Sequence, residues 1–155
     1  MKASKILRFV NLLLAGTLTG NEVGTLAGVH PALGELSPAE HIRAEQEVTR
    51  WLGAIMPFWM GLTIASSVLV ALSSRGEGGF RRTLLGAACL VALLASTRIG
   101  NVPINGRIIE MEPEKDQEEF AELRRRWDRL HTLRVALDVA GLAFLVSGAL
   151  AENRR

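Results

Sequence analysis

One row of side chains in the last third of the chain combines an aromatic ring, an imidazole and two opposite charges. Spacings of three and four residues place the row on one face of a helix. Its members are Phe120, Leu123, Trp127, His131, Arg134 and Asp138. His131 could serve as a base, because an imidazole titrates near neutral pH, and Trp127 could pack against a flat molecule. This face is therefore a candidate catalytic site.

A structural interpretation of the same face stays open. Trp127 could anchor the helix at a membrane interface, and Arg134 could form an ion pair with Asp138, four residues later. Charged residues inside a membrane protein are nevertheless costly, and they usually mark functional sites. We therefore keep both interpretations.

Two asparagines precede this helix in the sequence Asn-Val-Pro-Ile-Asn of residues 101–105. Pro103 disfavours helical geometry at Val102 and has no backbone N–H, so we expect the preceding helix to end here. The amides of Asn101 and Asn105 could bond to the freed backbone carbonyls, or they could hold an oxyanion of a ligand. The sequence does not decide between these two roles.

Further candidates lie closer to the amino terminus. His41 and Glu45 have the i, i+4 spacing of two ligands of one metal ion. Glu22 should face the bundle interior or an aqueous mouth, because a carboxylate that faces lipid costs about 2.5 kcal/mol or more. His30 stands directly before Pro31 and is interpreted as a helix-end residue. We expect Glu22, His41 and Glu45 to contact a substrate.

Neither a metal nor another cofactor is expected. The His-x-x-x-Glu pair has no second copy, and the single cysteine excludes a cysteine pair. The sequence contains no glycine-rich phosphate loop, no Gly-x-Ser-x-Gly and no His-Glu-x-x-His motif, which argues against nucleotide, serine-hydrolase and zinc-protease chemistry.

Four apolar segments must position these residues. A chain of 155 residues with 48% hydrophobic content has room for one domain, residues 1–155. A spanning helix needs about 20 apolar residues. The expected spans are residues 6–29, 51–73, 81–102 and 131–151. The fold class is therefore all-α, a four-helix transmembrane bundle in the lipid bilayer.

The charges between the spans predict the orientation. Lysine and arginine gather before the first span, between the second and third, and at the carboxyl terminus, whereas the other two connections are rich in acids. Positively charged loops stay in the cytoplasm. We therefore expect a multi-pass protein of the cell membrane with both termini cytoplasmic. The net charge of +2 then reflects topology, and no nucleic-acid partner is expected.

The second and fourth helices should extend beyond the membrane. Ser37, Pro38 and Glu40 form a capping box with proline at the first helical position, which starts a helix that runs into the second span. Residues 114–151 could form one helix on the order of 55 Å long, against a hydrocarbon core of ~30 Å. Both helices should project on the non-cytoplasmic side and pack together over the bundle.

The first span has small residues at every fourth position, namely Gly16, Gly20, Gly24 and Gly28. This spacing lets another helix approach closely, so a second copy of the chain could bind through the glycine face. The opposite face carries Asn11, Glu22 and Thr25. We therefore expect the first helix to pack on both sides.

Three motifs resemble those of the anthrone oxygenase-like family of small membrane proteins. They are His-x-x-x-Glu-Gln-x-x-x-Arg from His41 to Arg50, Asn-Val-Pro-Ile-Asn from Asn101 to Asn105, and Arg-Trp-x-x-x-His-x-x-Arg from Arg126 to Arg134. The resemblance covers nearly the whole chain and implies a four-helix membrane bundle. Named members of the family oxidise anthrones to anthraquinones, with no established cofactor signature. The residues that the resemblance selects are Asn101, Asn105, Trp127, His131 and Arg134.

The expected function is that of a membrane-embedded, oxygenase-like enzyme for a hydrophobic aromatic or quinone-type molecule. His131 would remove a proton from the CH₂ group beside an aryl ketone, and Arg134 and the asparagines would stabilise the enolate oxygen. The carbanion would then react with dioxygen without a cofactor. The alternative is a non-catalytic membrane protein that binds a lipid or stabilises a partner complex.

Overall fold

Residues 5–152 of the computed structural model are described here. The basic terminal residues Lys2, Arg154 and Arg155, which contributed to the predicted orientation, lie outside this range. Residues 5–152 form helices and short connections and contain no strand. The elements in chain order are α1 (Lys5–Gly24), η1 (Thr25–Val29), α2 (His30–Gly34), α3 (Pro38–Ser73), α4 (Phe80–Ser96), η2 (Thr97–Asn101), α5 (Val102–Ile109) and α6 (Gln117–Glu152).

Three helical segments are long and apolar enough to cross a membrane: Pro38–Ser73, Phe80–Ile109 and Gln117–Ala151. Large apolar side chains point outward from them, as at Phe58 and Ile99, which are 75% and 79% exposed. A lipid environment would cover such residues at no cost. The protein is therefore an all-helical chain with the character of a membrane protein, and a crossing by α1 stays a prediction.

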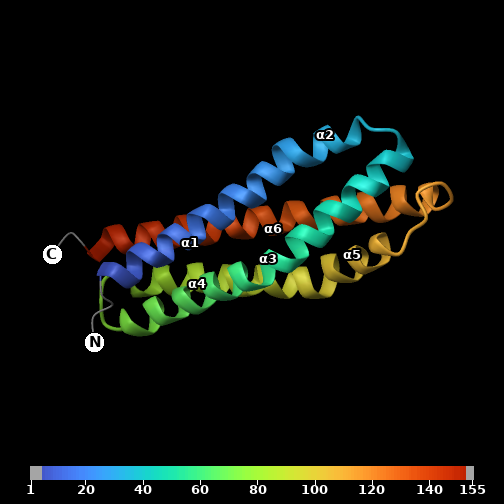
Figure 1. Cartoon of the computed structure of the whole chain (residues 1–155). Coiled ribbons are helices and arrows are strands. Elements are labelled where there is room, and N and C mark those ends of the chain that lie inside the picture. Colours follow the sequence, from blue (N-terminus) through green and yellow to red (C-terminus); the bar gives the residue numbers. More distant parts are fainter. Residues whose placement is uncertain (1–4, 153–155) are drawn as a thin grey trace.

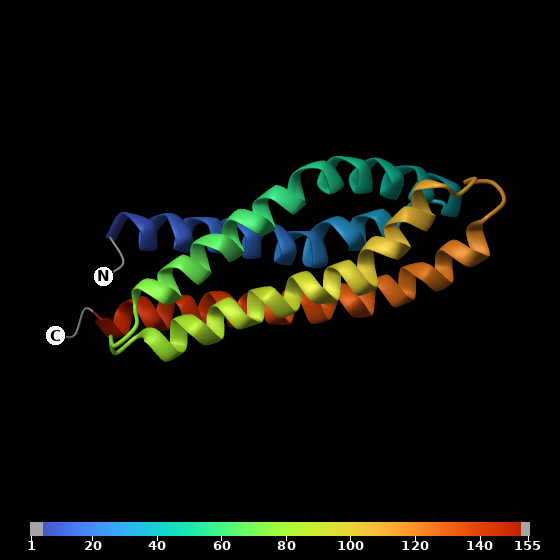
Figure 2. The same cartoon turned by 90° about the horizontal axis from the view of Figure 1, so that it is seen from below.

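The helices run side by side along one long axis (Figure 1). The start of α1, the end of α6 and the connection between α3 and α4 lie at one end of the molecule, and the other two connections lie at the opposite end (Figure 2). The capping box at Ser37 is present and starts α3 as expected.

Small residues bring α4 and α6 close together. A Cβ atom added to Gly86 of α4 would lie 2.8 Å from Leu145 Cγ and 2.9 Å from the carbonyl oxygen of Gly141. A Cβ atom at Gly148 would lie 2.6 Å from Thr83 Oγ1. Glycine therefore permits an approach that a side chain would prevent, as is common between membrane helices.

The expectation that α1 packs on both sides is wrong for the single chain. A Cβ atom added to any of the three glycines of this face in α1, or to Gly28 in η1, would meet nothing within 4 Å, so this face is open. The opposite face is the packed one. There Asn11 donates hydrogen bonds to Ser66 Oγ and Ser67 Oγ of α3, at 2.9 and 2.7 Å. Contact with a second copy through the glycine face stays a prediction.

The expected helix end at residues 101–105 is also wrong. The helix continues from α4 through the π-helical turn η2 into α5 and ends at Ile109. Val102 has helical angles, φ −60° and ψ −44°, and its N–H bonds to the carbonyl oxygen of Thr97. Pro103 then falls in the first turn of α5, where a missing backbone donor is tolerated. The first helix behaves in the same way, because η1 is followed by α2 with Pro31 near its start.

Candidate functional site

A cavity of about 510 Å³ opens among the helices, within the size range of small-molecule sites. Its apolar lining comes from α3, α4 and α5, and includes Leu52, Met56, Met60, Leu94, Val102 and Ile109. Its polar lining includes Glu22, His30, Glu45, Arg98, Asn105, Trp127, His131 and Arg134. A mostly apolar chamber with a few convergent polar groups is the usual form of a binding site for a small organic molecule.

The first polar cluster joins α1 to α6. Glu22 is 1% exposed and accepts a hydrogen bond from Nη2 of Arg134. Its other carboxylate oxygen, Oε2, lies 3.3 Å from Nδ1 of His131. The predicted ion pair between Arg134 and Asp138 is wrong, because the arginine reaches across to α1 instead. Asp138 is fully buried and has no ion pair with any residue in the range 5–152.

The second polar cluster joins α2 and α3 to α6. Glu45 is 3% exposed and accepts a hydrogen bond from Nη1 of Arg124. The same carboxylate oxygen lies 3.0 Å from Nδ1 of His30 and 3.7 Å from Nε2 of His41. Arg124 also donates to Asp128 Oδ1 through Nη2 at 2.6 Å. Each buried carboxylate of the cavity thus has its own arginine and its own histidine, which limits the cost of burying the charge.

Trp127 connects the two clusters. Its indole Nε1–H donates a 2.7 Å hydrogen bond to Oδ1 of Asn105. Its ring centre lies 4.6 Å from those of both His30 and His131, and Arg124 lies over the ring with Cζ 4.4 Å from the centroid. The indole is therefore held in one place between a hydrogen bond and a cation.

Six of the eight residues predicted for the site line this cavity: Glu22, Glu45, Asn105, Trp127, His131 and Arg134. Asn101 does not line it. That residue is fully buried, and its amide atoms have no hydrogen-bond partner in the part of the chain that the structure describes. His41 does not line it either, and packs edge-on against Phe120 at 4.9 Å between ring centres. The roles of all eight residues stay predictions.

The sequence interpretation missed His30 because it treated the residue as a helix end. In a continuous α-helix each residue turns the chain by about 100°, which would leave His30 roughly 80° away from Glu22. The five-residue π turn η1 lies between them. A π turn rotates the chain less per residue than an α-helix does. After five such residues, the next side chain points on the order of 90° behind its direction in a regular α-helix. The turn therefore brings His30 to the same side as Glu22.

Arg124 was also missed, although a signal was present. It lies three residues before Trp127 and seven before His131, so helical spacing alone places it on the same face. Because Arg124 belongs to a run of three arginines, residues 124–126, it was interpreted only as a group that repels cations. Its role as the partner of a carboxylate was therefore not predicted.

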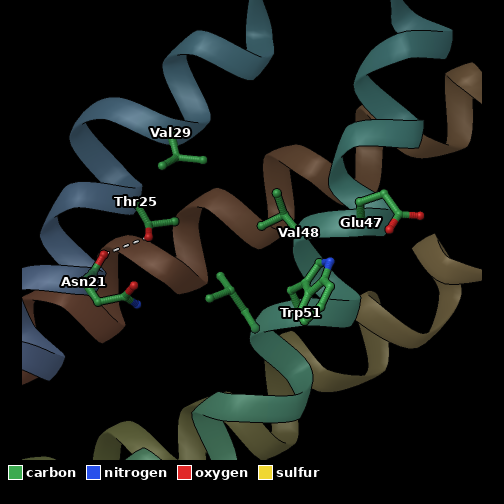
Figure 3. Close-up of a pocket in the computed structure, with 7 residues that line it drawn as sticks. Asn21, Thr25, Val29, Glu47, Val48 and Trp51 are labelled. Atoms are coloured by element: carbon green, nitrogen blue, oxygen red, sulfur yellow. Dashed lines mark hydrogen bonds between the residues drawn. The ribbon is translucent and has the colours of Figure 1, made fainter.

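A second, outer hollow of about 340 Å³ lies beside the cavity between η1 and α3 (Figure 3). Both are lined by Asn21, Thr25, Val48 and Leu52. Thr25 donates a 2.7 Å hydrogen bond to the carbonyl oxygen of Asn21, and Trp51 at the outer edge is 71% exposed. The cavity wall is therefore thin on this side.

No group of three or more histidine, cysteine or acidic side chains in residues 5–152 could hold a metal ion. That the site works without a metal stays a prediction. The arginines beside both carboxylates would repel a cation.

Residues 48–144 match the family model described as anthrone oxygenase. Neither the curated proteins nor the solved structures contain a match to the chain. The matched range holds most of α3 and α6 and all of α4 and α5, and so includes Asn105, Trp127, His131 and Arg134. It covers more than half of the 155 residues. The chain belongs to the anthrone oxygenase family.

Proposed function

We propose that the protein is a membrane-embedded oxygenase that oxidises an anthrone, or a similar hydrophobic aromatic or quinone-type molecule, without a cofactor. One observation supports this most: the apolar cavity contains an imidazole, a guanidinium and an amide around one tryptophan. An anthrone needs the same set, namely a base for its CH₂ group, donors for its oxygen and a flat surface for its rings.

In the proposed reaction His131 removes a proton from the CH₂ group. The negative charge moves to the ketone oxygen, where Arg134 and the amide NH₂ group of Asn105 donate hydrogen bonds. Glu22 holds Arg134 in position and contacts the same histidine. Glu45 contributes to substrate binding by fixing the opposite wall of the cavity. Dioxygen is the oxidant, and it enters through the apolar part of the chamber.

The test uses the purified protein in detergent with anthrone under air. We expect the rate of quinone formation, measured by the absorbance of the quinone, to exceed the rate in detergent without protein. One dioxygen should be consumed for each quinone formed. Asn105→Ala should slow the reaction, and Glu110→Gln, an exposed change directly after α5 and outside the cavity lining, should leave the rate at the wild-type value. A wild-type rate equal to the rate in detergent without protein would reject the proposed oxygenase activity. Retention of a co-purified lipid in the cavity would then favour the alternative, a non-catalytic lipid-binding protein.

We further propose that α1 crosses the cell membrane with the other three segments, so that both termini are cytoplasmic and α3 and α6 project outward. Cysteine labelling tests this in a Cys89→Ser background. A cysteine at Glu118, which is exposed, should react with an impermeant reagent added outside the cell. A cysteine at Gly78 should react only after the membrane is opened. Labelling at Glu118 only from the cytoplasmic side would reverse the orientation.

A further inference from the structure

We propose that His30 is a second acid–base group of the cavity, oriented by Glu45 and Arg124, and that it completes the oxidation by removing the second proton from the substrate carbon. This inference rests on the proposed function. His30 lies outside the range that matches the family model, so the contacts of this chain alone support it.

The hydrogen bond to Glu45 fixes the protonation pattern of the imidazole ring. Nδ1 of His30 lies 3.0 Å from Oε1 of Glu45. An ionised carboxylate only accepts hydrogen bonds, so Nδ1 carries the hydrogen, and in the neutral form of the ring Nε2 carries the lone pair. Nε2 is buried and has no hydrogen-bond partner within residues 5–152. His30 therefore offers an unused basic nitrogen in a ring that lines the cavity.

The carboxylate that orients His30 is itself held in place. Arg124 donates to Glu45 and to Asp128, and its guanidinium lies over Trp127. A carboxylate that fixes the tautomer and orientation of a histidine is the arrangement by which enzymes prepare an imidazole for proton transfer.

His30 and His131 face one chamber from different helices. Their ring centres are 5.4 Å apart, and each also contacts Trp127. His131 is next to Glu22, with its own arginine, Arg134. The two imidazoles thus have separate carboxylates, which allows each of them to gain and lose a proton at a different step.

The overall reaction requires two such transfers. Converting the CH₂ of an anthrone into C=O removes two hydrogens from one carbon. One atom of dioxygen becomes the new carbonyl oxygen, and the other leaves with the two hydrogens as water. In the first half His131 takes one proton, the carbanion adds dioxygen, and protonated His131 returns the proton to give a hydroperoxide, R₂CH–O–O–H. In the second half Nε2 of His30 takes the remaining C–H proton. The electron pair of this C–H bond forms C=O, and the O–O bond breaks. The departing hydroxide takes the proton from His30 and becomes water.

The experiment measures anthrone consumption and quinone formation separately in His30→Asn. The amide nitrogen of asparagine can occupy the place of Nδ1 and keep the bond to Glu45, while Nε2 is lost. We expect quinone formation to fall about 100-fold, the lower end of the range for loss of an acid–base group. Anthrone consumption should change by less than about threefold, and the hydroperoxide, two oxygen atoms heavier than anthrone, should accumulate in mass spectra.

Two further samples make the result decisive. His30→Gln removes the same nitrogen in a different shape and should show the same split between the two rates, should His30→Asn not fold. Ala32→Gln, an exposed change two residues later, should keep the wild-type ratio of products. If both His30 variants form quinone as fast as they consume anthrone, His30 is not a second acid–base group. The proposed oxygenase activity would not be affected by that result. A wild-type protein that consumes no anthrone would reject both proposals together.

Discussion

Replacing Glu22 by alanine is expected to lower the free energy of unfolding by about 3–5 kcal/mol. The carboxylate is the ion-pair partner of Arg134, and both side chains are more than nine-tenths buried. Its removal leaves a buried guanidinium charge without its ion-pair partner, which is among the most costly single changes in a protein. The measurement is the thermal unfolding midpoint of the detergent-solubilised protein, which should fall by several degrees.

A surface ion pair supplies the control. Arg107 donates two hydrogen bonds to Glu119, at 2.7 and 2.6 Å, but both side chains are more than 40% exposed. Glu119→Ala should therefore lower the unfolding midpoint far less than Glu22→Ala, because exposed ion pairs contribute little to stability. The double variant Glu22→Ala, Arg134→Met removes the buried charge altogether and should recover part of the loss. A midpoint for Glu22→Ala equal to that of Glu119→Ala would contradict the structural importance of the buried pair.

The apolar segments made the helices predictable. Uncharged runs such as residues 51–73 satisfy the length of a membrane span, and the segments Pro38–Ser73, Phe80–Ile109 and Gln117–Ala151 have that character in the structure. The capping box at Ser37 marked the start of α3 because its bonds are local. Local patterns of this kind can be predicted because they involve few long-range contacts.

The two π turns could not be predicted in the same way. Nothing in the composition of Thr25–Val29 or Thr97–Asn101 distinguishes these segments from ordinary helix, and the prolines after them favoured helix ends. Their effect on the site is nevertheless large, because one π turn rotates His30 into the cavity. Helical periodicity works only while the number of residues per turn stays constant.

Partner choice across helices was the other limit. Arg134 could reach Asp138 on its own helix, and only the arrangement of α1 against α6 shows that Glu22 is its partner. Helical spacing placed Trp127, His131 and Arg134 on one face, which is the part of the site that belongs to a single helix. The contacts of Glu45 with Arg124 and His30 join residues far apart in the chain and depend on tertiary structure.

The change His131→Gln is expected to lower kcat for anthrone oxidation by about 10²–10⁴-fold, with little change in KM. Glutamine has nearly the shape of histidine and keeps polar atoms beside Glu22, so the cavity should still bind the substrate. It cannot accept the proton of the CH₂ group, so the carbanion that reacts with dioxygen does not form. Anthrone consumption and quinone formation should therefore fall together, unlike in His30→Asn, where only the second should fall.

Thr132→Gln is the matched control, because Thr132 is the next residue of α6 and is exposed. Its kcat and its thermal midpoint should both equal the wild-type values. The midpoint of His131→Gln should also stay near wild type, because glutamine keeps polar atoms beside Glu22 and leaves the ion pair between Glu22 and Arg134 intact. A large fall in kcat at an unchanged midpoint separates loss of a base from loss of structure. Full activity in His131→Gln would instead move the first proton transfer to His30, the other imidazole of the cavity that lies beside a carboxylate.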